Sequence, residues 1–389
     1  MRDLSYWTEA YGNELIDFYR LGVQTRSYSD EEGDYAKLIE SKMIQLGFDD
    51  VYIDTVGNVV GRVGHGARII HFDSHMDTVS VKDEAHLSVP PFEGRIVDGQ
   101  LYGRGSADMK GGLSASVYAA ALAKQADLLN GKTVYITASV CQEYCDGVGL
   151  THFYQESGIR PNYCIICEPS DNLISLGNTG KVQARIKTKG LSAHGSAPEK
   201  GVNAVYEMAE IIERVEALNQ ALLETPGGGT IVLSEISCTS GSLNAVPSEC
   251  EIYLDRRIYL GESTLQVTEE IEALLKGKKA YWEPGTIRRT SWTGKELVYN
   301  PVHESWKIGE QHPLTKKCNE AYLATFGKGP TEYAYWDMST NAVTPVALSI
   351  PTIGFGPGEY KLSHTLDEHC SIEDVKDACA FYVELIDKL

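Results

Sequence analysis

The chain has 389 residues, which is more than one ordinary domain holds, so we expect two domains. Its 54 aspartates and glutamates outnumber the 35 lysines and arginines, and the formal net charge is −19. Such a charge repels phosphate backbones and anionic membrane surfaces, so the composition argues against nucleic acid and membranes as partners.

The amino-terminal stretch MRDLSYWTEAYGNELIDF is interrupted by charges and lacks the apolar segment of a secretory signal. No apolar run reaches the roughly 18 residues that a membrane-spanning helix needs. The nine cysteines are scattered and odd in number, and Cys164 and Cys167 lie in an apolar run typical of small buried thiols. We therefore expect reduced thiols and a cytoplasmic location.

Strand-like and helix-like segments alternate in the first part of the chain. Residues 1–47 are typical of two helices, and a helix rich in small residues begins near Gly111. The strand-like runs are VYIDTVGNVVGRV (51–63), RIIHFDSH (68–75), KTVYITASVC (132–141) and NYCIICE (162–168). This alternation predicts an α/β layer architecture.

The pattern changes near residues 177–180. The segments that follow are KVQARIKTKG (181–190), a helix over 201–218, the alternating strands GTIVLSEISC (229–238) and SECEIYLDRRIYL (248–260), and a helix over 264–275. This order predicts a small α+β domain with one antiparallel sheet.

The last part of the chain is too short to form a third domain. It predicts a helix near Leu314–Phe326, a strand within VALSIPTIGFG (346–356) and a closing helix from about Ile372. We expect it to complete the first domain. The predicted division is a catalytic domain of residues 1–178 and 293–389, with residues 179–292 inserted as a second domain.

Residues suited to metal binding stand at the ends of these strands and in glycine-rich loops. His75 and Asp77 follow the strand RIIHF, and residues i and i+2 of an extended chain face the same side. The carboxyl ends of strands in open α/β sheets are where sites form. Taken alone, the pair is equally typical of a capped strand end with a solvated histidine.

Four further residues extend this set. Asp108 lies in the loop GRGSADMKGG, Glu143 and Glu168 follow strands, and His364 follows another glycine-rich loop. Each alone has a plain interpretation, as a helix cap or a surface residue. Together, two histidines and three carboxylates match the ligands of a zinc site. A carboxylate shared between two ions would hold them about 3.5–4 Å apart, and such a site still needs a carboxylate base.

With these residues in place, the sequence resembles a family of co-catalytic zinc hydrolases. The family includes aminoacylase, glutamate-type carboxypeptidases, succinyl-diaminopimelate desuccinylase and dipeptidases. The matching motifs, in order along nearly the whole chain, are HMDTV, GRGSADMKGG, QEYCDGVG, CEPS, GLSAHGSAPEKGVNA, NAVPSECEIYLDRR and SHTLDEH. Within the family, the turn CDG, the segment STN (339–341) and GFGPGEYKLSHTLDE are most similar to the selenium-metabolism-linked hydrolases.

The resemblance implies a fold, a cofactor and metal ligands. It implies a mixed sheet between helices and an inserted lid domain through which two chains dimerise. It implies two zinc ions per chain, for which cobalt and manganese are substitutes. His75 and Glu168 would bind one ion, His364 and Glu143 the other, and Asp108 would bridge both through a cis peptide to Met109.

The resemblance also implies roles around the metal ions. Asp77 would orient His75, and His194 would reach the active site of a partner subunit to hold the substrate oxyanion. Further positions match substrate-binding and cleft-lining residues of the family, namely Asn244 and Arg257 for a substrate carboxylate, and Gly356 and Gly358 for the cleft wall. The expected reaction is hydrolysis of an amide, peptide or N-acyl bond in a small substrate that carries a carboxylate.

Gln142 departs from the family pattern. The family has two adjacent glutamates, a general base followed by a metal ligand, and these positions are Gln142 and Glu143 here. An amide cannot take a proton from water at neutral pH, and a positioned base is worth about 10²- to 10⁴-fold in rate. We therefore expect impaired hydrolysis by the usual route.

Three explanations of Gln142 remain open. It could be an engineered Glu→Gln change, a natural residue whose task passes to Asp146 or Tyr144, or the mark of a natural pseudo-enzyme. The alternative to a hydrolase is therefore a catalytically silent, metal-dependent protein that binds a small molecule.

Overall fold

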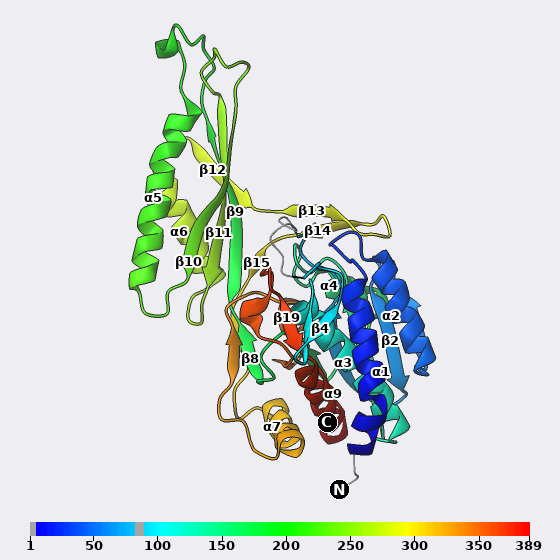
Figure 1. Cartoon of the computed structure of the whole chain (residues 1–389). Coiled ribbons are helices and arrows are strands. Elements are labelled where there is room, and N and C mark those ends of the chain that lie inside the picture. Colours follow the sequence, from blue (N-terminus) through cyan, green and yellow to red (C-terminus); the bar gives the residue numbers. More distant parts are fainter. Residues whose placement is uncertain (1–4, 82–88) are drawn as a thin grey trace.

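The computed structural model describes residues 5–81 and 89–389, and Figure 1 shows the chain folded into a larger and a smaller body. The larger body is built on a nine-stranded sheet in the order β1-β2-β6-β3-β7-β18-β8-β16, with β17 paired to β8. Its strands are β1 (Asp50–Ile53), β2 (Val59–Gly64), β3 (Arg68–His75), β6 (Lys132–Ser139), β7 (Tyr163–Ile166), β8 (Ser175–Asn178), β16 (Trp306–Lys307), β17 (Ala334–Trp336) and β18 (Thr352–Gly354).

The sheet is mixed in direction. Strand β3 runs parallel to both of its neighbours, β6 and β7, whereas β2 is antiparallel to β6. The helices of this body are α1 (Ser5–Gln24), α2 (Gly33–Gln45), α3 (Gly111–Gln125), α4 (Val148–Ser157), α7 (Pro313–Phe326), α8 (Val343–Ala347) and α9 (Ile372–Lys388). The predicted α/β class with a mixed sheet is therefore confirmed.

Helix α3 lies at the centre of the larger core. It carries small residues on every side, and residues 111–123 are all buried. A helix without a polar face is typical of a fully enclosed position. It packs against α9 and α1, so the first and last helices of the chain meet around it.

The strand predicted within residues 346–356 is only partly correct. Helix α8 extends to Ala347, and β18 covers only Thr352–Gly354. Pro345 is compatible with this short helix because the first turn of a helix leaves N–H groups unpaired.

The smaller body is an antiparallel sheet covered by two helices. Its strands follow the order β10-β11-β9-β12, and β15 also pairs with β9. The elements are β9 (Gly180–Lys189), α5 (Ala204–Glu224), β10 (Thr230–Thr239), β11 (Glu249–Ile258), α6 (Thr264–Leu274), β12 (Ala280–Pro284) and β15 (Val302–His303). A separate cluster of buried side chains, including Ile186, Ile211 and Leu254, fills the space between sheet and helices.

A hairpin joins the two bodies. Strands β13 (Ile287–Thr290) and β14 (Glu296–Tyr299) extend from the smaller body to the larger one, as Figure 1 shows. At the hairpin tip, Trp292 Nε1 donates to the Gly57 carbonyl at 3.1 Å, and Thr293 Oγ1 donates to the Thr55 carbonyl at 2.8 Å. We keep the division at residues 178/179 and 292/293 as a proposal, with the second boundary inside this hairpin.

The described residues also form a further small sheet and three short helical turns. A three-stranded sheet contains β4 (Arg95–Val97), β5 (Gln100–Tyr102) and β19 (His369–Ser371). Short helical turns occur at Ser106–Lys110, Pro198–Lys200 and Tyr360–Leu362. Within residues 5–81 and 89–389, no helix has the length and apolar character needed to cross a bilayer.

Candidate metal centre

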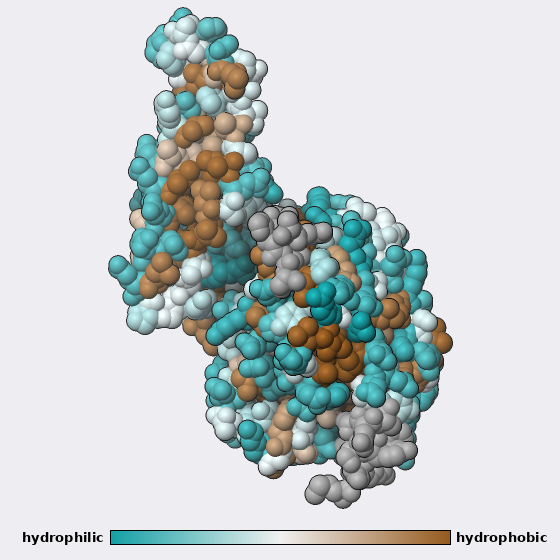
Figure 2. All heavy atoms as spheres, in the orientation of Figure 1, coloured by the Kyte–Doolittle hydropathy of each residue, from teal (hydrophilic) through white to brown (hydrophobic). Residues whose placement is uncertain are grey.

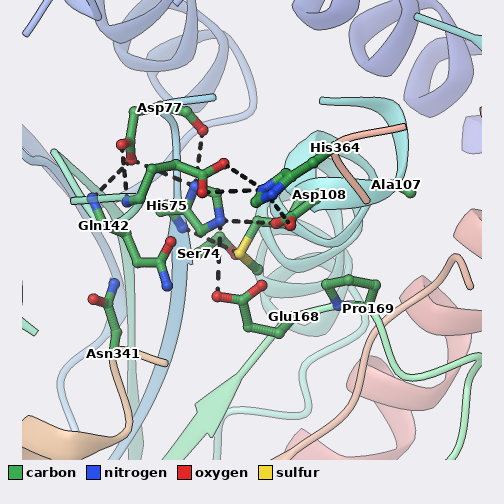
Figure 3. A network of polar contacts seen from close by, with 12 residues as sticks. Ser74, His75, Asp77, Ala107, Asp108, Gln142, Glu168, Pro169, Asn341 and His364 are labelled. Carbon is green, nitrogen blue, oxygen red and sulfur yellow. Dashed lines mark hydrogen bonds and ion pairs between the residues drawn. The ribbon is translucent and has the colours of Figure 1, made fainter. Parts of the chain in front are cut away.

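The predicted metal ligands meet at one edge of the larger sheet. His75 is the last residue of β3, Glu168 follows β7, and Glu143 follows β6. Because β3, β6 and β7 are parallel, their carboxyl ends lie side by side. Asp108 and His364 reach the same place from loops. Figure 3 shows the side chains of His75, Asp108, Glu168 and His364 turned toward one another.

The five side chains form two ligand groups that share Asp108. In the first, His75 Nε2 lies 3.0 Å from Asp108 Oδ1 and 3.7 Å from Glu168 Oε1. In the second, His364 Nε2 lies 3.4 Å from Asp108 Oδ2 and 3.1 Å from both carboxylate oxygens of Glu143. Among the residues described, these are the two groups with the geometry to hold a metal ion.

The charges and contacts of the cluster fit a pair of cations. Glu168 Oε2 is buried and has no hydrogen-bond partner within the described part of the chain. Burial raises the pKa of Glu168, because the charged carboxylate is removed from water. Three carboxylates and two imidazoles are the hard-oxygen and nitrogen donors that zinc accepts.

The two histidines respond to the same excess of negative charge. Hydrogen bonds to Asp108 and then Glu143 raise the pKa of His364 from 6.5 to about 10. Burial favours neutral His75, but Glu168 and Asp108 together raise the pKa of this ring well above its usual value. A cation at either position would neutralise the charge that these shifts reflect.

Asp77 holds both His75 and the loop that carries Glu143. The Asp77 carbonyl oxygen lies 2.9 Å from His75 Nδ1, and its Oδ1 lies 3.4 Å from the same atom. The carboxylate also accepts the N–H of Gln142 at 2.9 Å, the N–H of Glu143 at 3.1 Å and the Ser29 hydroxyl at 2.6 Å. The predicted contact with His75 is present, whereas no local sequence pattern indicates the contacts to the loop.

The loop of Asp108 has the predicted cis peptide bond to Met109. Its backbone is held by Glu368, whose Oε1 accepts the N–H groups of Ala107 and Asp108 at 3.1 Å each. In the sequence, Glu368 is part of the motif SHTLDEH, four residues after His364. Its role could not be inferred, because the partners lie about 260 residues apart.

The sequence profile of peptidase family M20/M25/M40 matches residues 71–388, a range that contains both ligand groups. The chain belongs to this family. The predicted resemblance to aminoacylase-like metal hydrolases is therefore confirmed at the level of the family.

Relatives of this M20 family member include proteins of similar length. It is 36% identical over 380 residues to the uncharacterized protein YgeY of Escherichia coli K12, covering 96% of this chain and 94% of that protein. It is 29% identical to acetylornithine deacetylase of Vibrio parahaemolyticus, covering 92% and 94%. A dinuclear metal-binding peptidase of the M20 family from Bacillus subtilis shares its fold, with a TM-score of 0.67, 15% identity and coverage of 97% and 98%.

In this M20 chain, Gln142 is buried and its side chain lies at the cluster, on the side of Asn341 in Figure 3. Asn341 supports the turn after Glu143, because its Oδ1 accepts the Gly147 N–H at 2.7 Å. Its Nδ2 donates to Asp73 and Ser139 at 2.8 Å each. The turn is therefore anchored from both ends, by Asp77 and by Asn341.

The two substitute proton carriers considered from the sequence have other partners. Asp146 Oδ2 lies 2.6 Å from Lys181 Nζ and accepts the Tyr299 hydroxyl at 3.1 Å. Burial opposes the charged form of Asp146, but Lys181 lowers the pKa of its carboxyl below the usual value. Tyr144 is 43% exposed, and its ring stacks under the Arg289 guanidinium at 4.3 Å. Neither belongs to the two ligand groups.

His194 and Asn244 lie together in the smaller body. Both are exposed, and the Gly195 N–H donates to the Asn244 carbonyl at 2.6 Å. His194 Nδ1 lies 2.7 Å from Ser196 Oγ. The loop that carries His194 follows β9 at the end of the smaller body far from the larger one in Figure 1. The structure therefore does not bring these residues to the metal ligands of the same chain.

Arg257 lies on a strand of the smaller body, whereas Gly356 and Gly358 lie in a loop of the larger body. Arg257 is on β11, and its Nη2 lies 2.9 Å from Asp255 Oδ2. At Gly356 a Cβ atom would come within 2.4 Å of the Glu168 carbonyl oxygen, so only glycine fits beside this ligand. Gly358, with φ of +92°, lies against Ala107. Both glycines therefore allow the loops of Glu168 and Asp108 to pack closely.

Proposed function

We propose that this chain is a two-metal hydrolase of an amide, peptide or N-acyl bond in a small substrate that carries a carboxylate. The observation that carries the proposal is the pair of ligand groups joined by Asp108. Family membership and the named acetylornithine deacetylase relative support the same class of reaction.

We infer that the ions are zinc, with cobalt and manganese as substitutes. Zinc ions at the two groups would polarise the scissile carbonyl and acidify a bound water. The protein would hold the ligands fixed, with His75 oriented by Asp77 and Asp108 oriented by Glu368. Elemental analysis should find two metal ions per chain, and a value of one or none would contradict the proposal.

Arg257 is the residue we assign to the substrate carboxylate. Its guanidinium pairs with Asp255 on one side. Burial lowers the pKa of Arg257, but the neighbouring Asp255 carboxylate outweighs this effect and holds the pKa above its usual value. A permanently charged, planar donor suits a bidentate contact with a carboxylate. Arg257→Lys should raise KM more than it lowers kcat, because it weakens substrate binding in general.

Gln142, at the position of the general base, limits the rate of hydrolysis by this chain. A Gln142→Glu variant should hydrolyse N-acyl amino acids or dipeptides about 10²- to 10⁴-fold faster, the range for a positioned general base. The effect should appear in kcat, because glutamine and glutamate have nearly the same shape and bind substrate alike. Gln155→Glu, the same change at an exposed position of α4, is the matched control and should change nothing.

The second candidate function is a metal-dependent binding protein without catalysis, which the amide at position 142 favours. The two functions differ in the behaviour of the Gln142→Glu variant. A hydrolase should gain turnover, whereas a silent binder should bind the same ligand without cleaving it. Mass spectrometry of small molecules that co-purify with the unmodified chain would identify the ligand in either case.

We also propose a homodimer formed through the smaller body. Strand β10 is at the edge of its sheet, and Val232 and Ile236 on that strand are 56% and 53% exposed. Figure 2 shows apolar side chains gathered over the same body. Exposed apolar residues on an edge strand favour pairing with a second chain.

A dimer would give His194 a role in the neighbouring active site. To test this, a His194→Ala chain is mixed with an Asp108→Ala chain, each also carrying Gln142→Glu. Mixed dimers should regain activity, because one site in each then has a complete set of residues. Verified mixed dimers without recovered activity would contradict action between subunits.

A further inference from the structure

Glu368 is a buried carboxylate beside the ligand cluster that belongs to neither ligand group. It follows His364 by four residues and is 3% exposed. Its contacts are with the protein backbone and with Arg104, not with the ligand side chains. A buried charge of this kind is costly unless it has hydrogen-bond partners, so its contacts define what it does.

Glu368 holds the whole turn that leads to Asp108. Its Oε1 accepts the N–H groups of Ala107 and Asp108 at 3.1 Å each, and its Oε2 forms an ion pair with Arg104 Nη1. Its carbonyl oxygen also accepts the Gly103 N–H at 3.1 Å. One residue therefore fixes the backbone from position 103 to position 108.

Arg104 connects this turn to the loop of His364. Its Nη2 donates to the His364 carbonyl oxygen at 3.4 Å, while its Nη1 pairs with Glu368. The side chains of Arg104 and Glu368 are 5% and 2% exposed, so water does not compete strongly for the pair. The two residues form a bracket between the loops that supply Asp108 and His364.

The second ligand group needs such a bracket more than the first. His75 ends a hydrogen-bonded strand, and the Asp77 carbonyl fixes its ring. His364 lies outside any helix or strand, has a φ of +63°, and its side chain is 48% exposed. Among the described residues, its ring is held by contacts with Asp108 and Glu143.

We propose that Glu368 and Arg104 are positioning residues for the metal ion held by Asp108, Glu143 and His364. The inference rests on the proposed two-metal function. Removing the bracket should selectively weaken the binding of this ion, because the backbones of two of its three ligands, Asp108 and His364, lose their support. The ion held by His75, Asp108 and Glu168 loses support at Asp108 alone and keeps its two strand-end ligands, so its binding should change much less.

The experiment is a titration of the metal-free full-length chain with Co²⁺, in which calorimetry and visible absorption measure the binding of each ion. Glu368→Gln should weaken the affinity for the ion of the second ligand group by about 10- to 100-fold, the usual effect of removing a partner that orients a ligand. The first ion should stay within about threefold and thereby reports that the variant is folded. Glu373→Gln, an exposed glutamate in the first turn of α9, is the matched control.

Variants of Arg104 separate positioning from general stability. Arg104→Met should weaken the same ion, and Arg104→Lys should recover part of the loss because it restores the charge. In the double variant Glu368→Gln with Arg104→Met, the loss of binding free energy for this ion should be smaller than the sum of the losses in the two single variants. This is expected for two residues that act as one bracket. A general loss of stability would weaken both ions equally.

The possible outcomes distinguish this inference from the proposed function. Equal weakening of both ions, or an unchanged second ion, overturns the positioning role and leaves the hydrolase proposal intact. Selective loss of the second ion, together with a Gln142→Glu variant that hydrolyses nothing, supports the positioning role and overturns the hydrolase. An unmodified chain that binds fewer than two Co²⁺ ions overturns both.

Discussion

The two ligand groups meet at Asp108 but are built in different ways. The histidine of the first group, His75, has a side chain that is 1% exposed, whereas the side chain of His364 in the second group is 48% exposed. The first group comes from adjacent parallel strands, and the second takes His364 from a loop. We call them the strand group (His75, Glu168) and the loop group (Glu143, His364).

The difference shows that one ligand group is held rigidly by the sheet, while the other is accessible to solvent through His364. Strand β3 pairs with β6 and β7, and β7 pairs with β3 and β18, so the sheet holds the strand group in place without a metal ion. The loop group depends on side chains that act from outside it, and its His364 faces water. We therefore expect the strand group to bind its ion more tightly, and the loop group to be the side on which substrate enters.

The largest expected effect is the loss of a whole ion. His364→Ala should leave one ion per chain, bound with the tighter of the two affinities. His75→Ala should remove that tighter ion, with a loss well above the roughly 100-fold seen for partners that only orient a ligand. Elemental analysis and a Co²⁺ titration measure both. His152→Ala, on α4 outside both groups, is the control, and equal residual affinities in the two variants would contradict the comparison.

Asp77 gives a smaller and more selective effect. Its carbonyl, which contacts His75, is present in any variant, but its carboxylate holds the N–H groups of Gln142 and Glu143. Asp77→Ala should therefore weaken the ion of the loop group by about 10- to 100-fold and the ion of the strand group by less. The opposite order would mean that the carboxylate acts mainly on His75 through the 3.4 Å contact.

The smallest expected effect concerns the strand that ends in His75. His71 lies on the same strand and is fully buried between Tyr154 and Thr137. Burial lowers the pKa of His71 from 6.5 to about 3, so the folded chain favours the neutral ring. Its contribution to stability is complete above pH 6.5 and is lost as pH falls toward 3.

This shift predicts that acid weakens the strand side of the site. Between pH 7 and pH 5 the His71 ring should cost about 2 kcal/mol of unfolding free energy. Denaturant unfolding of the metal-free chain should show this loss, and His71→Gln should show a loss smaller by that amount. An identical pH dependence in both proteins would contradict the assigned pKa shift.

Sequence patterns predicted the parts of the site that depend on local chemistry. His75, Asp108, Glu143, Glu168 and His364 were each placed at a strand end or in a glycine-rich loop, and the structure brings all five together. A strand end is visible in a sequence because apolar alternation stops there. Whether each residue binds metal stays a prediction.

The supporting residues could not be predicted in the same way. Glu368 and Arg104 contact each other across 264 positions, and nothing near either residue signals the pairing. The hairpin of β13 and β14 was missed because its strands are only four residues long, and its anchor, Trp292, contacts Gly57 across 235 positions. Long-range pairing is decided by the folded shape and not by local propensity.

The place of β18 in the larger sheet has a consequence for biosynthesis. This strand comes from residues 352–354, yet it lies between β7 and β8, which are made almost two hundred residues earlier. Until it emerges from the ribosome, the larger sheet has an open slot with unpaired edges, the kind of surface on which chains aggregate. His364 emerges only after β18. The ligand cluster can therefore be completed only once residue 364 has been synthesised, and a product terminated before β18 would lack both the closing strand and a candidate metal ligand.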